Sequence, residues 1–359
     1  MEYLSLEVKK VIKETNDAVS VHFKQPEDKK IDYKSGQFFT FIFDINGKEE
    51  RRAYSLCSSP YVDADLAVAV KRVNKGLVSN HINSSIKEGD VIKALPPTGA
   101  FTLVPDQSKE RHIVLLGGGS GITPLFSILK TVLKEESKSK ITLVYANQSK
   151  ESTIFAEQIA KVQADNSDRL SVLHYLDEEN LGKKKLLGLK KQKPYLTKAR
   201  LKEMLAPLKL TLSDPVEFFI CGPSGMMKVA EDTLLSLSFP SSSIKKESFV
   251  SLEAPKSKSK TKNKAEQGEP KKVKVKYLAQ EYDFEVQPGV PILQTALDNG
   301  VDLPFSCQSG LCTACMGKLI QGKIDMRMNL ALTDQEVDQG MVLTCVGHPT
   351  TDDVVIEIE

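Results

Sequence analysis

Four cysteines near the end of the chain constrain its fold more than any other feature. Cys307, Cys312 and Cys315 follow the spacing C-x4-C-x2-C, and Cys345 comes 30 positions after the third of them. Plant-type domains hold a [2Fe–2S] cluster through four thiolates at this spacing. The small residues around Gly310 let the backbone come close enough to aim N–H groups at the sulfur atoms. The pattern therefore predicts that these four cysteines are the metal ligands of one cluster.

Two disulfides or a structural zinc ion are the alternative uses of four cysteines. Zinc sites favour two C-x2-C pairs, whereas this sequence contains one. The opening segment, MEYLSLEVKKVIKE, is charged and lacks the apolar core of a secretion signal. Six cysteines without such a signal indicate a reducing compartment, so we expect a cytoplasmic protein whose thiols act as ligands. Apolar runs such as residues 113–116 are far too short for membrane insertion.

The pattern of apolar and polar residues changes along the chain. Its 359 residues suit two or three domains. Residues 1–105 contain short runs with period-two alternation, which indicates a small antiparallel β-barrel. Residues 106–250 alternate short apolar runs with helical patterns, which indicates an α/β domain with a parallel sheet, carrying an exposed basic loop at 182–194. Residues 251–271 are rich in Lys, Ser and Pro and indicate a flexible linker. The cysteines then belong to a separate domain at 272–359.

Charge is distributed unevenly between this last domain and the rest of the chain. Residues 272–359 hold 6 Lys and Arg against 13 Asp and Glu, a net charge of −7, whereas the whole chain carries +2. An acidic domain on a basic body suggests modules that attract one another, or an acidic carrier that docks on a basic partner. Ordinary surface charge for solubility is the alternative.

Two glycine-rich turns follow predicted strands of the α/β region. The first, GGGSGITP at 117–124, precedes a helix whose N-terminus offers free N–H groups to a pyrophosphate. Its order differs from G-x-G-x-x-G, and Asn147 and Gln148 stand where an acidic residue would follow, so we do not expect the ordinary two-lobed dinucleotide fold. The second, CGPSGMM at 221–227, would lie at the same sheet edge. A buried strand-end residue is the alternative for Cys221.

Two further signals lie in the barrel region. Arg52, Tyr54 and Ser55 end a predicted strand, where an arginine fork suits a phosphate and a tyrosine face suits a planar ring. Gly76 and Ser79, in KRVNKGLVS, could offer N–H and hydroxyl donors to a pyrophosphate. Surface arginines and cross-strand tyrosines are common, so each signal is ambiguous by itself.

The order of the motifs resolves their meaning. R-x-Y-S, G-x-x-S, GGGSGITP, CGP and the plant-type cysteine spacing follow one another as in the ferredoxin–NADP reductase superfamily with a C-terminal ferredoxin domain, over essentially the whole chain. Within it, the chain most resembles the reductase subunit of ring-1,2-phenylacetyl-CoA epoxidase and related oxygenase reductases. The resemblance implies a multidomain fold: a flavin-binding antiparallel β-barrel, an α/β nucleotide domain and an α+β ferredoxin domain of the β-grasp type. It implies FAD, with FMN as the alternative.

Family positions imply individual roles. Tyr54 and Cys221 would be the catalytic pair at the flavin and nicotinamide, and Phe249 would be an aromatic near the flavin, unless it only closes the core at the last strand. The other positions implied for the flavin are Arg52, Ser55, Gly76, Val78 and Ser79. Those implied for the nicotinamide dinucleotide are Gly118, Gly119, Ser120, Gly121, Thr123, Cys221, Gly222 and Pro223. Many relatives carry an arginine for the 2′-phosphate of NADPH where this chain has NQSK at 147–150, so the donor is NADPH or NADH.

These features together predict an electron converter. A hydride carries two electrons, whereas a [2Fe–2S] cluster accepts one. A flavin can take up two electrons together and release them one at a time. The expected acceptor is a partner oxygenase or desaturase of the di-iron or Rieske type. A reductase for ferredoxin, flavodoxin or a quinone, and a [2Fe–2S] redox sensor, are the alternatives. No nucleic-acid partner is expected, because the lysines of the linker lack interleaved aromatic residues.

Overall fold

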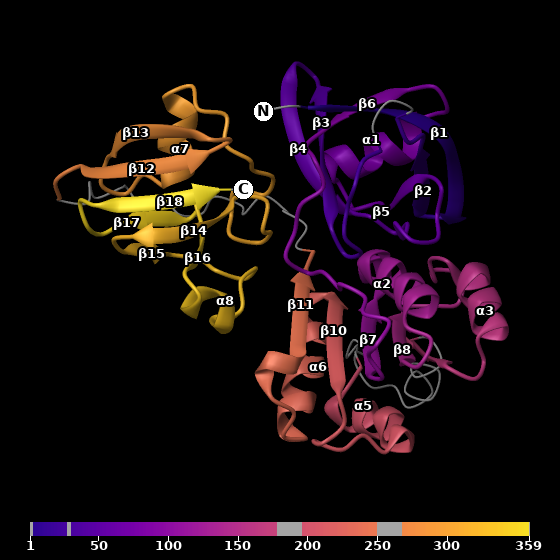
Figure 1. The fold of residues 1–359 in the computed structure, drawn as a ribbon. Helices are drawn as coiled ribbons and strands as arrows, with labels where there is room; N and C mark the ends of the chain where they lie inside the picture. Colours follow the sequence, from indigo (N-terminus) through magenta and orange to yellow (C-terminus); the bar gives the residue numbers. More distant parts are fainter. Residues whose placement is uncertain (1–2, 27–29, 178–195, 250–267, 359) are drawn as a thin grey trace, which may run out of the picture.

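The computed structural model describes residues 3–26, 30–177, 196–249 and 268–358, which form three bodies, each on its own main sheet (Figure 1). In this view the first two bodies stack one above the other, and the third lies beside them. The predicted combination of an antiparallel barrel, a parallel-sheet domain and an α+β domain is confirmed. Within the described ranges, no helix is both long and apolar enough to cross a membrane.

Six antiparallel strands build the first body, in the order β4-β3-β6-β1-β2-β5. Its elements are β1 (Leu4–Thr15), β2 (Ala18–Phe23), β3 (Phe38–Ile45), β4 (Lys48–Ser55), β5 (Leu66–Lys71), α1 (Leu77–Ser85) and β6 (Val91–Ala94). Phe39 and Phe41 of β3 lie in the core with ring centroids 5.9 Å apart. Leu56, just after β4, bridges Val68 of β5. The two edge strands therefore meet, and the sheet closes into a barrel.

The second body is a parallel sheet with helices on both faces, in the order β11-β10-β7-β8-β9. Its elements are β7 (His112–Gly118), α2 (Ile122–Glu135), β8 (Lys140–Asn147), α3 (Ala156–Asp165), β9 (Leu170–Leu176), α5 (Lys198–Leu205), β10 (Val216–Gly222), α6 (Ser224–Ser236) and β11 (Ile244–Ser248). Strand side chains alternate between faces. Ile113 and Leu115 of β7 pack toward α2 and α3, whereas Val114 and Leu116 pack toward α5 and α6.

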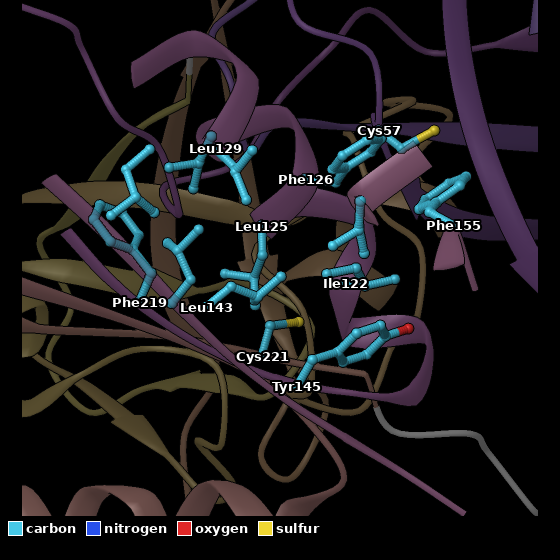
Figure 2. Close-up of a cluster of buried hydrophobic side chains, with 14 of the residues drawn as sticks. Cys57, Ile122, Leu125, Phe126, Leu129, Leu143, Tyr145, Phe155, Phe219 and Cys221 are labelled. Atoms are coloured by element: carbon cyan, nitrogen blue, oxygen red, sulfur yellow. The ribbon is translucent and has the colours of Figure 1, made fainter. Parts of the chain in front are cut away.

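The barrel and the parallel-sheet body share one apolar core (Figure 2). Leu125 and Leu129 of α2 pack onto Leu143 of β8 and Phe219 of β10. Cys57 of the barrel belongs to the same cluster, as do the other barrel residues Ala18, Ala67, Ala69, Phe101 and Leu103. Such a continuous core holds the two bodies in one fixed arrangement.

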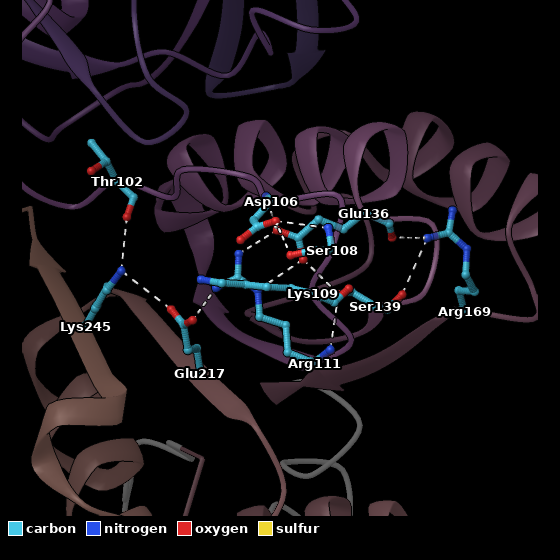
Figure 3. Close-up of polar contacts among 10 residues, drawn as sticks. All are labelled: Thr102, Asp106, Ser108, Lys109, Arg111, Glu136, Ser139, Arg169, Glu217 and Lys245. Carbon is cyan, nitrogen blue, oxygen red and sulfur yellow. Dashed lines mark hydrogen bonds and ion pairs between the residues drawn. The ribbon is translucent and has the colours of Figure 1, made fainter.

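A buried ionic network supports the start of β7 (Figure 3). Arg111 donates through Nε to Glu136 Oε2 at 3.0 Å and also pairs with Glu217. Ser139 Oγ donates to the same Glu136 oxygen at 2.7 Å, and Lys245 Nζ lies 3.6 Å from Glu217 Oε2. The carboxylate of Glu136 is fully buried, so these donors replace the water that it loses on folding.

The third body is a mixed sheet in the order β13-β12-β18-β14-β16, beside a two-stranded sheet of β15 and β17. Its elements are β12 (Lys271–Tyr277), β13 (Gln280–Val286), α7 (Ile292–Asp298), β14 (Met316–Gln321), β15 (Ile324–Met326), α8 (Asp334–Asp338), β16 (Met341–Leu343), β17 (Gly347–Pro349) and β18 (Val354–Ile358). β12 pairs in parallel with β18 and antiparallel with β13. Its core cluster contains residues of this body alone.

Two expectations fall partly or wholly outside the described residues. The basic loop at 182–194 lies outside them, and so does the linker up to residue 267. Lys271, the last residue assigned to the linker, is the first residue of β12. The domain boundaries themselves stay predictions.

Candidate functional site

A cavity of about 1240 Å³ opens where the three bodies meet. It is larger than the ~300–1,000 Å³ typical of small-ligand pockets, so it suits a ligand of dinucleotide size. Eleven of the residues singled out from the sequence lie on its wall: Arg52, Tyr54, Ser55, Gly76, Val78, Ser79, Ser120, Thr123, Phe249, Cys307 and Cys312. The barrel motifs, part of the first glycine turn and the cysteine loop therefore face one common space.

The end of β4 presents Arg52 and Tyr54 to the cavity. The guanidinium of Arg52 donates from Nη1 to the carbonyl of Arg51 at 2.7 Å, and its Nη2 lies 3.0 Å from Glu50 Oε2. The Tyr54 ring packs 5.7 Å from the ring of Phe41, which anchors it on the barrel core. Burial raises the pKa of the Tyr54 hydroxyl, so this side chain stays neutral at physiological pH. The strand thus offers a cation beside a neutral aromatic face.

A tight turn before α1 forms the next part of the wall. Ser79 Oγ accepts a hydrogen bond from the Val73 N–H at 3.1 Å, and Asn80 Nδ2 donates to the Gly76 carbonyl at 2.6 Å. A Cβ atom on Gly76 would lie 2.6 Å from Ser79 Oγ, so only glycine fits without a shift. The first N–H groups of α1 have no partner within the helix, which makes this turn a ready anion site.

The two glycine turns of the parallel sheet interlock. A Cβ atom on Gly121 would lie 2.2 Å from the Cys221 carbonyl oxygen, and one on Gly222 would lie 2.9 Å from the Gly118 nitrogen. Gly119 differs, because its φ is +53° and nothing stands within 4 Å of its added Cβ. Most of these residues support the wall rather than line it. Those not on the cavity wall are Gly118, Gly119, Gly121, Cys221, Gly222 and Pro223.

Cys221 lies in the shared apolar core. Its side chain is fully buried beside Leu125 and Tyr145 (Figure 2). Burial raises the pKa of its thiol well above the ordinary range, and the nearby Glu247 carboxylate adds to this. A thiol in such surroundings stays protonated and is a poor nucleophile. The structure brings Cys221 to the strand end next to the cavity, and its catalytic role stays a prediction.

Sequence reasoning missed Glu247, which lies on the cavity wall next to two predicted residues. β11 pairs with β10 so that Glu247 stands opposite Cys221. Ser55 Oγ donates to Glu247 Oε2 at 3.0 Å. Burial raises the pKa of this carboxyl to about 8, although the hydrogen bond from Ser55 opposes the shift. The only signal for it was an acidic side chain at the end of the last strand, in KKESF.

The four predicted cluster ligands come together at one end of the third body. Cys315 and Cys345 are buried, whereas Cys307 and Cys312 are partly exposed and line the cavity. Hydrogen bonds from Cys312 and Cys345 lower the pKa of Cys307, and a hydrogen bond from Cys345 lowers that of Cys315. Within the described ranges, no three His, Cys, Asp or Glu side chains surround a single-ion position. The four thiols form one connected series, Cys312–Cys307–Cys345–Cys315, as ligands of a single cluster would.

Backbone N–H groups surround the cysteine loop as a cluster requires. Leu311 N–H points at Cys307 Sγ, with a nitrogen–sulfur distance of 3.4 Å. Backbone N–H groups of Ala314 and Gly310 also hydrogen-bond to the Cys312 and Cys345 sulfurs, although the contact of each with Cys307 raises the pKa of both thiols overall. Gly310 has a φ of +71°, and a Cβ atom there would lie 2.3 Å from the Met328 carbonyl oxygen. These contacts stabilise thiolates, so the loop fits a [2Fe–2S] cluster.

Comparisons with known families divide the chain in the same way. Residues 5–103 match the oxidoreductase FAD-binding domain, residues 115–232 match the oxidoreductase NAD-binding domain, and residues 275–350 match the 2Fe-2S iron-sulfur cluster binding domain.

Curated relatives match almost end to end. The chain is 33% identical to a subunit of 1,2-phenylacetyl-CoA epoxidase from Escherichia coli, with 99% of this chain and 97% of that protein covered. It is 35% identical to the ferredoxin reductase component of 3-ketosteroid-9-alpha-monooxygenase from Mycobacterium tuberculosis, with 98% and 95% covered. The solved structure of phthalate dioxygenase reductase has the same fold, at a TM-score of 0.59 and 22% identity over 99% of this chain and 98% of that one.

Proposed function

Because this chain belongs to the oxygenase reductases that join an FAD-binding, an NAD-binding and a [2Fe–2S] domain, we propose that it takes electrons from NADH or NADPH for one dedicated oxygenase component. The chain is an NAD(P)H-dependent oxidoreductase with FAD and a [2Fe–2S] cluster as cofactors. One observation carries the proposal: barrel residues, a glycine turn and two cluster cysteines share one cavity.

FAD supplies the link between hydride transfer, which moves two electrons, and a cluster that accepts one electron at a time. Arg52 is the residue placed to bind a phosphate, and Tyr54 gives a flat neutral surface for a ring. The turn at Gly76 adds N–H donors for the pyrophosphate. These residues would bind and orient the flavin.

Ser120 and Thr123 supply the cavity side of the nicotinamide site. Thr123 Oγ1 donates to the Ser120 carbonyl at 3.0 Å, which orders the turn at the start of α2. Cys221 holds the neighbouring turn in place from within the core. Phe249, 37% exposed and on the cavity wall, would cover the flavin until the nicotinamide displaces it. Ser152 and Thr153 donate to the Ser149 carbonyl and close the turn after β8, where we propose that NADH and NADPH would be distinguished.

Glu247 is the acid of this site. Burial raises its pKa to about 8, so the carboxyl titrates near neutral pH, and Ser55 Oγ donates to it at 3.0 Å. A neutral acid in an enclosed site can donate a hydrogen bond or a proton where negative charge develops. Ser55 and Glu247 therefore form the polar end of the cavity between the barrel and β11.

The acceptor is proposed from the relatives. The E. coli relative is a component of 1,2-phenylacetyl-CoA epoxidase, and the M. tuberculosis relative serves a ketosteroid monooxygenase. We propose an oxygenase of the di-iron or Rieske type and a cytoplasmic location, where six free cysteines remain reduced.

The experiment has two stages. The purified protein is first titrated with NADH or NADPH while the flavin and cluster absorption bands are followed. The variant Arg52→Ala is the control, because it should lose flavin and retain the cluster. Bleaching of both bands supports the proposal, whereas a native protein with an intact cluster and no flavin overturns it.

In the second stage the reduced protein is used to capture its acceptor from the native cell. Recovery of a di-iron or Rieske oxygenase component supports the assignment. Recovery of small ferredoxins alone contradicts it and favours a general ferredoxin reductase.

A further inference from the structure

Arg51 connects the barrel to the cluster domain, although it is not on the cavity wall. It lies on β4 between Glu50 and Arg52, and its side chain is 7% exposed. Its Nη2 lies 3.2 Å from Asp302 Oδ1 in the third body. Successive side chains of a strand point in different directions. The strand that places Arg52 in the flavin cavity therefore sends its neighbour to the iron–sulfur domain.

Three further residues surround this pair. The guanidinium carbon of Arg51 lies 4.2 Å from the centre of the Phe305 ring, and Arg51 Nε donates to Glu49 Oε1 at 2.7 Å. Tyr3 OH donates to Asp302 and lies 3.4 Å from Arg51 Nη2. We name Arg51, Asp302, Phe305 and Tyr3 the Arg51 dock. Exposed ion pairs contribute little, but an arginine held by stacking and by several oxygens has a defined position.

The dock is next to the cluster loop in sequence and in space. Phe305 is two residues before Cys307, which lines the cavity. Between the two dock residues, Leu303 is fully buried in the core of the iron–sulfur domain, and its N–H donates to the Val301 carbonyl at 2.9 Å. Because the segment from Asp302 to Phe305 is anchored in this way, its contacts with Arg51 help to set the position of the cysteine loop.

We propose that Arg51, through Asp302 and Phe305, positions the iron–sulfur domain so that its Cys307 and Cys312 edge faces the flavin cavity. Arg51 is a positioning residue for electron transfer from the flavin to the cluster, and the inference rests on the proposed function. The domain has its own core cluster, so it depends on specific contacts for this orientation. The dock also joins a basic residue of the barrel to an acidic residue of the iron–sulfur domain. These signs agree with the net negative charge of residues 272–359 and the net positive charge of the rest of the chain.

The test separates the two electron steps in stopped-flow experiments on the holoprotein. Arg51→Ala and Asp302→Asn should leave flavin reduction by NADH within about twofold and slow the subsequent bleaching of the cluster about 10- to 100-fold. The double variant should be no slower than Arg51→Ala alone, because both changes break the same contact. Asp65→Asn is the matched control, since it breaks an ion pair of 2.9 Å to Lys9 within the barrel.

A second readout is independent of the cofactors. Small-angle X-ray scattering of the same variants prepared without FAD should show a larger radius of gyration for Arg51→Ala and Asp302→Asn than for Asp65→Asn. Cluster bleaching at the native rate, or an equal fall in both electron steps, overturns the inference. A native protein whose flavin is not reduced by NADH or NADPH overturns the proposed function instead.

Discussion

The barrel meets its two neighbours through different kinds of surface. Its boundary with the parallel-sheet body is a continuous apolar core that includes Cys57, Phe101 and Phe219. Its boundary with the iron–sulfur body includes the polar Arg51–Asp302 pair, whereas that body's core cluster stays within itself. Apolar cores resist relative movement, and polar interfaces between domains allow it. The proposed sites would thus place hydride transfer between two bodies packed as one unit, and electron transfer to the cluster across a more polar boundary.

The largest expected effect comes from removing the cluster of the iron–sulfur body. Cys345→Ser should abolish the [2Fe–2S] cluster, because we propose the buried Cys345 as one of its four thiolate ligands. Reduction of ferricyanide by NADH, which draws electrons from the flavin, should remain. Cys57→Ser is the control and should keep the cluster, since Cys57 lies in the other core. A Cys345→Ser protein with the native cluster spectrum would contradict the ligand assignment.

The next largest effect concerns the stability of the barrel and the parallel-sheet body, which pack as one unit. Glu136→Ala should lower the free energy of unfolding by up to about 3–5 kcal/mol, because it removes the buried partner of Arg111 and leaves only the more exposed Glu217. Urea denaturation measures this loss. Glu203→Ala is the matched control, since its pair with Arg200 is exposed and should contribute less than about 1 kcal/mol.

The same residue predicts a pH dependence. Burial raises the pKa of Glu136, but hydrogen bonds from Arg111 and Ser139 outweigh it, so the net pKa is lowered. A carboxyl with a depressed folded pKa stabilises the protein above its unfolded pKa, and this stabilisation is lost as pH falls through the folded pKa. The difference in free energy of unfolding between the native protein and Glu136→Gln should therefore decrease as the pH falls. A difference that is constant with pH would argue against the ion pair.

A smaller effect concerns the interlocked glycine turns. Gly121→Ala places a Cβ atom 2.2 Å from the Cys221 carbonyl oxygen, so we expect a loss of about 1–3 kcal/mol in stability and weaker NADH binding. Thermal unfolding and the KM for NADH measure the two effects. Gly225→Ala is the control, because nothing lies within 4 Å of its added Cβ at the start of α6, and its stability should be unchanged or slightly higher. Equal thermal stability and equal KM for the Gly121→Ala and Gly225→Ala variants would contradict the close packing of the two turns.

The finest test concerns Glu247. Its pKa rises from 4.5 to about 8 in the folded protein, so the protonated carboxyl contributes stability below pH 4.5 that is lost as pH rises through 8. In the protein without FAD, the melting temperature of the native chain should fall across this range relative to Glu247→Gln. Ser55→Ala should move the inflection upward, because the Ser55 hydrogen bond lowers this pKa. Parallel melting curves for native and Glu247→Gln proteins would contradict the raised pKa.

Local spacing explains what could be predicted. The first three cysteines, the GGGSG turn and the R-x-Y-S strand end each occupy a short segment, and a cofactor imposes the spacing within it. Glu247 and Arg51 were missed because neither belongs to such a segment. Glu247 owes its raised pKa to burial alone, against the opposing hydrogen bond from Ser55, which is 192 positions away. Arg51 has its partner Asp302 251 positions away.

The sequence by itself determined the three kinds of domain and their order, and it predicts the cluster ligands, because these depend on periodicity and on cysteine spacing. Only the tertiary structure decided that Cys307 and Cys312 turn toward the flavin cavity, that Cys221 lies in a core, and that Arg51 joins the barrel to the cluster loop. Those outcomes depend on which distant surfaces pack together, and packing between domains leaves no periodic trace in a sequence.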